Sequence, residues 1–319
     1  MIQVVKEEKM TYQSFINMVC TMLKDRLGKG YELRLHKVTK NNSLELDSLV
    51  VLKTGNTYAP NIYLLSYYES YLEGTEVTDI IDRLYHLYIS NTKPVLDRNF
   101  NYTFDEMKSN ITYRLISFNR NEKLLSQVPY IKYLDLAITF HCLVKEDEDG
   151  IGTIRITNEH LSAWNISLED LQEVANINTC NLFPATIKSM EDTIKGIVMD
   201  TPIKGGENIS DDDFSLLLNP SYYNDNASMY VLTNKQGING ASCLLYEDLI
   251  RSFADKLQSD LYILPSSIHE LILIPTQNNG DRSSLKEMVV EVNLTQVAPE
   301  EVLSDNVYYF NRKQNAIIL

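Results

Sequence analysis

The sequence has few cysteines and no long apolar run, and both shortages narrow the class of protein. The four cysteines, Cys20, Cys142, Cys180 and Cys243, lie far apart in a chain of 319 residues and form no CxxC pair. No stretch approaches the roughly 18 consecutive apolar residues of a membrane span. The opening residues, MIQVVKEEKM, carry too short an apolar run for a secretion signal. We therefore expect reduced, mostly buried thiols and a cytoplasmic protein.

Basic residues are also in short supply. Lysine and arginine number 29 against 43 aspartates and glutamates, which gives a formal net charge of −14, and no run of basic residues occurs. A protein that binds nucleic acid through the phosphates needs a concentrated Lys/Arg surface. We expect no nucleic-acid partner through a basic surface and no membrane partner, whereas a protein partner remains open.

Motifs for nucleotides, metals and hydrolysis are missing as well. The chain has no GxGxxG, Walker, HExxH or GxSxG motif. Its five histidines are isolated at spacings that do not put two ligands on one helix face. The acidic run KEDEDG, residues 145–150, fails as a calcium loop because Lys145 stands where the first acidic ligand belongs, so it predicts a hairpin turn. We expect no metal site and no cofactor.

Residues 229–275 hold the densest apolar periodicity of the chain, and we interpret them as the centre of the fold. Residues 229–233 are β-prone and precede a turn rich in Asn and Gly, which predicts a hairpin. Residues 249–257 carry one apolar stripe at helical spacing. Residues 261–264 and 268–274 then predict two strands, joined by a polar turn that begins at Pro265.

That polar turn holds the only compact cluster of chemically versatile side chains, Ser266, Ser267, His269 and Glu270. They supply the residue types of a hydrolytic triad. Neighbours in a strand point to opposite faces, so His269 and Glu270 should not touch. Ser267 and His269 do share a face, which leaves open a Ser–His pair completed by a distant acid. The other interpretation is a serine-capped turn with two exposed polar residues.

The remaining periodicities predict an α+β fold. A helix over 12–27, strands over 31–38 and 44–53, and a helix from 77 that ends before Pro94 form an αββα unit. Further helices are predicted over 104–117, from 167 with Ser167 and Asp170 as a capping box, and over 183–199. The expected domains are an N-terminal αββα module (1–95), a connecting helical segment (96–128), and a larger body of antiparallel hairpins packed against helices (129–319). The body has an insertion near 201–226, either a surface loop or a mobile flap.

Tyrosine is unusually frequent, with 20 residues, and five of them crowd residues 58–71. Tyrosine offers a large contact area at a small entropic cost. One interpretation is therefore an exposed recognition surface in which Tyr67 and Tyr71 bind a partner. The other is core packing in which the hydroxyl groups reach solvent.

Several blocks together resemble a known family over residues 12–312, nearly the whole chain. They include YELRLHKVTKNN, PYIKYLDLAITF, SAWNISLEDLQEVANINT and DLYILPSSIHELILIP. The family is the bacterial domain-of-unknown-function family 5688, and the resemblance implies an intracellular protein without an assigned activity, cofactor or catalytic residue. The order of predicted elements is also similar to that of domain-of-unknown-function family 1444, which carries no function over either.

The absence of catalytic motifs and the charge balance favour a non-catalytic protein-binding or adaptor protein. One alternative is a hydrolase or transferase that uses Ser267 or His269 at a pocket roofed by residues 201–226. Another is an acidic immunity or anti-defence protein that neutralises a basic partner.

Overall fold

The computed structural model describes residues 9–54, 61–90, 103–147, 150–200, 229–265, 267–278 and 282–319. The contacts within the chain divide it into two compact units. We call Met1–Lys40 with Leu44–Phe100 the N-terminal unit, and Asn41–Ser43 with Asn101–Leu319 the C-terminal unit. Within the described ranges, no helix combines the length and the apolar character that a membrane crossing requires.

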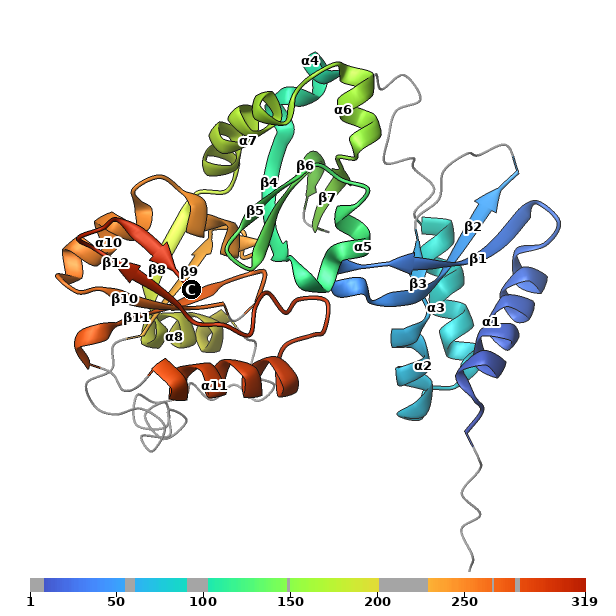
Figure 1. Ribbon diagram of the computed structural model, residues 1–319. Coiled ribbons are helices and arrows are strands. Elements are labelled where there is room, and N and C mark those ends of the chain that lie inside the picture. Colours follow the sequence, from blue (N-terminus) through green and yellow to red (C-terminus); the bar gives the residue numbers. More distant parts are fainter. Residues whose placement is uncertain are drawn as a thin grey trace, which may run out of the picture. The chain divides into compact units, whose positions relative to one another are not determined.

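The N-terminal unit packs helices against a small antiparallel sheet (Figure 1). α1 (Tyr12–Leu27) begins at Thr11, whose hydroxyl accepts a hydrogen bond from Ser14 N, and stops at Gly28, where φ is 75°. The other elements are β1 (Tyr31–Thr39), β2 (Glu45–Lys53), β3 (Ile62–Tyr63), α2 (Leu65–Leu72) and α3 (Val77–Ser90). The predicted αββα order is confirmed, with β3 and α2 inserted before the last helix.

Four strands form the first sheet of the C-terminal unit, and β6 runs through its middle. They are β4 (Ile111–Ser117), β5 (Tyr130–Tyr133), β6 (Leu136–Asp147) and β7 (Gly150–Arg155). One edge of β6 pairs with β4, and its other edge pairs first with β5 and then with β7, always antiparallel. The hairpin predicted at residues 145–150 is confirmed by the pairing of Asp147 with Gly150.

β4 lies at the edge of this sheet, and α7 (Leu168–Leu182) contacts its free side. Tyr113 N donates to Thr179 Oγ1 at 3.0 Å, and Asn178 Nδ2 donates to Ile111 O at 3.0 Å. Two side chains of α7 thus form hydrogen bonds with backbone groups of β4 that no described strand satisfies. α7 itself begins with the predicted capping box of Ser167 and Asp170.

The second sheet of the C-terminal unit has six antiparallel strands in the order β13-β12-β10-β11-β9-β8. They are β8 (Ala185–Ser189), β9 (Tyr230–Asn234), β10 (Leu261–Leu264), β11 (Leu271–Pro275), β12 (Tyr308–Asn311) and β13 (Ala316–Ile318). Besides α7, the helical segments of this unit include α4 (Phe104–Met107), α5 (Glu122–Leu125), α6 (Asn158–Trp164), α8 (Met190–Asp200), η4 (Gly240–Leu245), α10 (Leu249–Leu257) and α11 (Arg282–Thr295). The α+β class with antiparallel sheets is confirmed.

The prediction that residues 229–275 form the centre of the fold agrees with the position of β10 and β11 in the middle of the six-stranded sheet. Leu261, Ile263, Leu271 and Leu273 are fully buried in the main core. The opposite face of β10 and β11 packs on α11 through Leu285 and Val289. α8 lies on the same side of the sheet as α11 (Figure 1).

The predicted helix over residues 104–117 is wrong from Ile111 onward: α4 continues as a 3₁₀ turn over Lys108–Asn110, and residues 111–117 form β4. Met107, Ile111 and Leu115 recur every four residues, and four is a multiple of the strand period as well as close to the helix period. Six of the seven residues of β4 are buried, so the strand shows no alternation that would reveal it.

The predicted helix over residues 183–199 is wrong in its first part, where Ala185–Ser189 form β8 and only Met190–Asp200 are helical. Thr186 and Ile187 are β-branched and favour the strand. The hairpin predicted after residues 229–233 is also wrong, because the chain enters the 3₁₀ segment η4 instead and β9 pairs with β8 and β11.

Candidate functional site

The polar turn that follows β10 is built from hydrogen bonds among its own members. Ser267 is 4% exposed, and its hydroxyl donates to Glu270 Oε1 at 3.1 Å and accepts from His269 N at 2.9 Å. Ser266 lies outside the described residues. Ser267 and Glu270 are therefore brought together as a turn, and the imidazole of His269 takes no part in that pair.

The imidazole of His269 has two partners that are far away in the sequence. Nδ1 accepts from Asn239 N at 3.1 Å, and Nε2 lies 3.4 Å from Glu301 Oε1. Because Nδ1 accepts, the ring proton of the neutral form belongs on Nε2, facing the carboxylate. Neither nitrogen faces Ser267, so the hydroxyl of Ser267 has the Glu270 carboxylate as its partner and not the imidazole.

The backbone of this turn approaches the start of η4 closely. Thr233 Oγ1 donates to His269 O at 2.8 Å, and Ala241 N donates to Ile268 O at 3.2 Å. Ile268 N in turn donates to Glu301 O at 2.8 Å. The turn therefore joins the start of η4, the end of β9 and the segment around Glu301.

Tyr67 and Tyr71 are both half-buried against the core of the N-terminal unit. The Tyr71 hydroxyl accepts from Met10 N at 3.1 Å, and its ring stacks on Phe15 with the centroids 5.6 Å apart. The side chains thus have packing roles of their own, whichever part of their surface a partner could reach.

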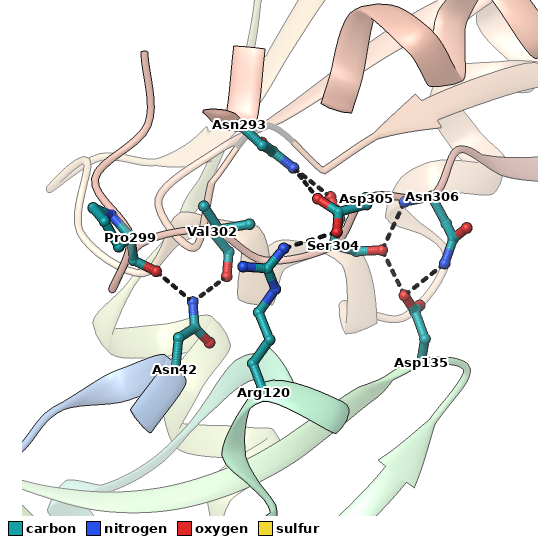
Figure 2. A network of polar contacts seen from close by, with 9 residues as sticks. All are labelled: Asn42, Arg120, Asp135, Asn293, Pro299, Val302, Ser304, Asp305 and Asn306. Carbon is teal, nitrogen blue, oxygen red and sulfur yellow. Dashed lines mark hydrogen bonds and ion pairs between the residues drawn. The ribbon is translucent and has the colours of Figure 1, made fainter. Parts of the chain in front are cut away.

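A second polar cluster, which the sequence analysis missed, surrounds Asp135 in the turn between β5 and β6 (Figure 2). Its Oδ2 accepts from Ser304 Oγ at 2.5 Å and from Asn306 Nδ2 at 3.0 Å, and its Oδ1 accepts from the Tyr308 hydroxyl at 2.7 Å. Ser304 and Tyr308 are buried. Burial, followed by the charge of Asp135, raises the pKa of Tyr308 far above its usual range. One carboxylate therefore anchors the segment that leads into β12.

The same segment is held by two further sets of contacts (Figure 2). Asp305 accepts from Arg120 Nη2 at 2.7 Å and from Asn293 Nδ2 at 3.0 Å. Burial opposes ionisation of Asp305, but these bonds hold the pKa of its carboxyl below the usual range. Asn42 Nδ2 donates to the carbonyl oxygens of Pro299 and Val302 at 2.8 and 2.7 Å. These contacts hold the segment from Pro299 to Asn306 in place.

A third cluster lies on one face of the four-stranded sheet and is basic. The register pairs Arg114 with Thr139 and pairs His141 with both Thr112 and Arg155, so Arg114, His141 and Arg155 share that face. Burial and the neighbouring Arg155 lower the pKa of Arg114 to about 10. Burial first, and then Arg114 and Arg155, lower the pKa of His141 well below its usual value. Perturbed titration of this kind is common at functional sites.

The buried His141 predicts a stability that falls on acidification. Folding lowers the pKa of His141 below its unfolded value of 6.5. The folded protein therefore has its full stability above pH 6.5. It loses stability as the pH falls below that value, because the unfolded chain binds the proton more readily. Urea unfolding, followed through Trp164 in the C-terminal unit, should show wild type losing up to about 1.4 kcal/mol per pH unit relative to His141→Gln below that value. At pH 8 the His141 imidazole is neutral in both the folded and the unfolded state. The difference in unfolding free energy between wild type and His141→Gln at that pH therefore measures the effect of the substitution that does not depend on protonation. Parallel pH curves for the two proteins would contradict the assignment.

An apolar groove of about 660 Å³ lies in the same unit. Its apolar lining consists of Phe118, Leu125, Val128, Pro129, Tyr130, Leu161 and Leu168, and Glu122, Ser126 and Asn158 complete it. Tyr130 is 36% exposed, and its ring centroid lies 5.9 Å from that of Phe118. A groove with this lining can take an apolar side chain of a ligand or partner. The sequence analysis assigned none of these residues to a site.

Among the described residues, no group of three or more His, Cys, Asp and Glu side chains is arranged to hold a metal ion. No curated protein and no solved structure matches the chain. The resemblance to domain-of-unknown-function family 1444 stays a prediction. A family model, described as a family of unknown function (DUF5688), matches residues 12–312. This match covers nearly all of the sequence, and the chain therefore belongs to the DUF5688 family.

Proposed function

We propose that the protein is a non-catalytic binding protein that holds a basic protein partner. The observation that carries the proposal is that these groups already have partners: His269 Nδ1 accepts from Asn239 N, the Ser267 hydroxyl donates to Glu270, and His269 Nε2 lies 3.4 Å from Glu301 Oε1. These bonds hold the turn together, and activating the serine would require breaking them. A hydrolase or transferase function finds no favouring geometry there.

The groove and the net charge support the binding part of the proposal. Interface cores are enriched in aromatic and apolar side chains, and Phe118, Tyr130 and Leu168 provide such a lining. A net charge of −14 attracts basic partners and repels acidic ones. We therefore assign the groove to a basic protein that inserts an apolar side chain. An adaptor and an immunity protein that neutralises a basic partner share this chemistry.

The test is site-specific photo-crosslinking in the cells that make the protein. A photoreactive residue in place of Tyr130 should form an adduct of one defined mass, whereas one in place of Leu294, which is 80% exposed on α11, should not. The captured protein is then purified and titrated against wild type and Leu168→Asn. Loss of a groove contact should weaken binding by about tenfold or more, and added salt should weaken it further.

The matched control is Leu294→Asn, which also replaces a leucine by a neutral amide but leaves the groove intact. It should bind as wild type does. Adducts of the same mass from both positions, or equal affinity of wild type and Leu168→Asn, would reject the groove as the binding site. An acidic partner would reject the charge argument.

A further inference from the structure

β1 forms one edge of the N-terminal sheet along its whole length of nine residues. Among the described strands, only β2 pairs with it. Leu35 is 43% exposed, and Glu32, Arg34, His36 and Lys37 are exposed as well. A long, exposed edge strand is a template for pairing with another chain. The N-terminal unit therefore presents an edge that a further strand can extend.

The hydrogen bonds at the two ends of β1 show which of its residues face this open edge. Lys40 N donates to Leu44 O at 2.7 Å, and Thr54 N donates to Gly30 O at 2.9 Å. Hydrogen-bonded pairs alternate along an antiparallel ladder, so the even-numbered residues of β1 make the hydrogen bonds to β2. The N–H and C=O groups of the odd-numbered residues therefore point to the open edge.

Successive side chains of β1 lie on opposite faces of the sheet, and the two faces differ in character. Tyr31 and Leu33 pack against the core of the N-terminal unit, and Leu35 continues the same row. On the other face Arg34 binds Glu32 through two bonds, Nε to Oε1 at 2.8 Å and Nη2 to Oε2 at 3.2 Å. Both of these side chains are more than half exposed. Over residues 31–35 the edge therefore has an apolar row on one face and one charge of each sign on the other.

Two copies of this segment match each other when they pair antiparallel about Leu33. A two-fold axis at Leu33 places Glu32 of each copy opposite Arg34 of the other, because these residues flank the axis equally. It also places Tyr31 opposite Leu35 on the apolar face. An axis at Arg34 would set two arginines opposite each other, and an axis at Leu35 would set neither charge opposite its counterpart. Like charges directly opposite destabilise a strand pair, so the sequence selects the axis at Leu33.

We propose that β1 pairs with β1 of a second copy of the chain, antiparallel and centred on Leu33, so that two N-terminal sheets join into one. Glu32 and Arg34 then form an alternating group with their counterparts, in which each charge has an opposite charge beside it and across from it. The same charges disfavour strands that lack this pattern, which makes the edge specific. Because the contact is small for a protein interface, we expect a reversible dimer. The inference does not depend on the proposed partner binding.

The experiment measures the mass of the full chain by analytical ultracentrifugation at protein concentrations up to about 1 mM, the range in which weak complexes form. Wild type should shift from monomer to dimer as the concentration rises. Glu32→Arg leaves only positive charges at the contact, and Arg34→Glu leaves only negative ones. Each variant alone should therefore weaken dimerisation by about tenfold or more. Circular dichroism checks that both variants fold.

A mixture of the two variants tests the register, because the arginines of one copy then face the glutamates of the other. The mixture should form a heterodimer with about the affinity of wild type, which neither variant reaches alone. The control is Arg83→Glu, which changes the net charge as Arg34→Glu does but lies exposed on α3, and it should dimerise as wild type does.

Four results would each overturn the proposal. They are a wild type that stays monomeric, single variants that dimerise as wild type does, a mixture that does not associate, and an equal loss of dimer in Arg83→Glu. A monomeric wild type would mean that any strand at this edge comes from a different protein. The groove variants test partner binding separately.

Discussion

Asp135→Ala is expected to destabilise the C-terminal unit by about 3–5 kcal/mol, because the substitution breaks a charged, partly buried hydrogen-bond centre. The carboxylate accepts from Ser304, Asn306 and Tyr308. Tyr308 is fully buried and Ser304 nearly so, which leaves their hydroxyl groups without an acceptor after the substitution. Urea unfolding followed by Trp164 fluorescence measures the loss.

Two further variants show whether the loss comes from these bonds. Asp135→Asn retains one acceptor oxygen but turns an amide toward the donors, so it should lose an intermediate amount. Tyr308→Phe removes one donor and should cost about 1–2 kcal/mol. The double variant with Asp135→Ala should show a coupling of about 1 kcal/mol or more, because the two groups contact each other. Additive effects, or a loss below about 1 kcal/mol for Asp135→Ala, would show that the carboxylate is not the anchor.

Gly240→Ala is expected to destabilise the same unit by about 3 kcal/mol or more, at the upper end of the range for overpacking. A Cβ at this position would lie 2.8 Å from Asn234 N and closer still to His269 O and Thr233 Oγ1. Two of these atoms belong to the backbone and cannot rotate away. The turn that carries His269 would have to move away from η4.

Gly196→Ala is the matched control, since a Cβ there would meet nothing within 4 Å and the residue lies inside α8. It should be neutral or stabilise the protein by about 0.5–1 kcal/mol, because alanine favours the helix. Thermal unfolding of the two variants beside wild type gives the comparison. A Gly240→Ala protein as stable as wild type would mean that the close approach of the turn to η4 relaxes without cost.

The fold could be predicted from the sequence where local periodicity and tertiary burial agree. Residues 249–257 form one apolar stripe and become α10, and the residue before Pro265 ends β10 as expected. The prediction fails where burial on both faces removes the alternation, as in β4. It also fails at Ala185–Ser189, where a helix and a strand meet without a strong break between them.

The candidate sites were harder to predict than the fold. Ser267 and Glu270 are close in sequence, and their pairing is local. The partners of His269, by contrast, are 30 residues away or more, and only the tertiary structure selects them. Arg114 and His141 share a face only because of the register between β4 and β6. Because the apolar spacing predicted a helix at residue 114, the register between β4 and β6 could not be predicted.

The hydrogen bonds between β4 and the side chains of Thr179 and Asn178 also affect the solubility of the protein. The segment ITYRLIS is rich in β-branched and apolar residues and has an open ladder of backbone groups on that side. Such edges recruit strands from other molecules and seed aggregates. The side chains of α7 occupy the positions where an intruding strand would dock, so in the folded protein this helix shields the edge of β4 from pairing with another molecule.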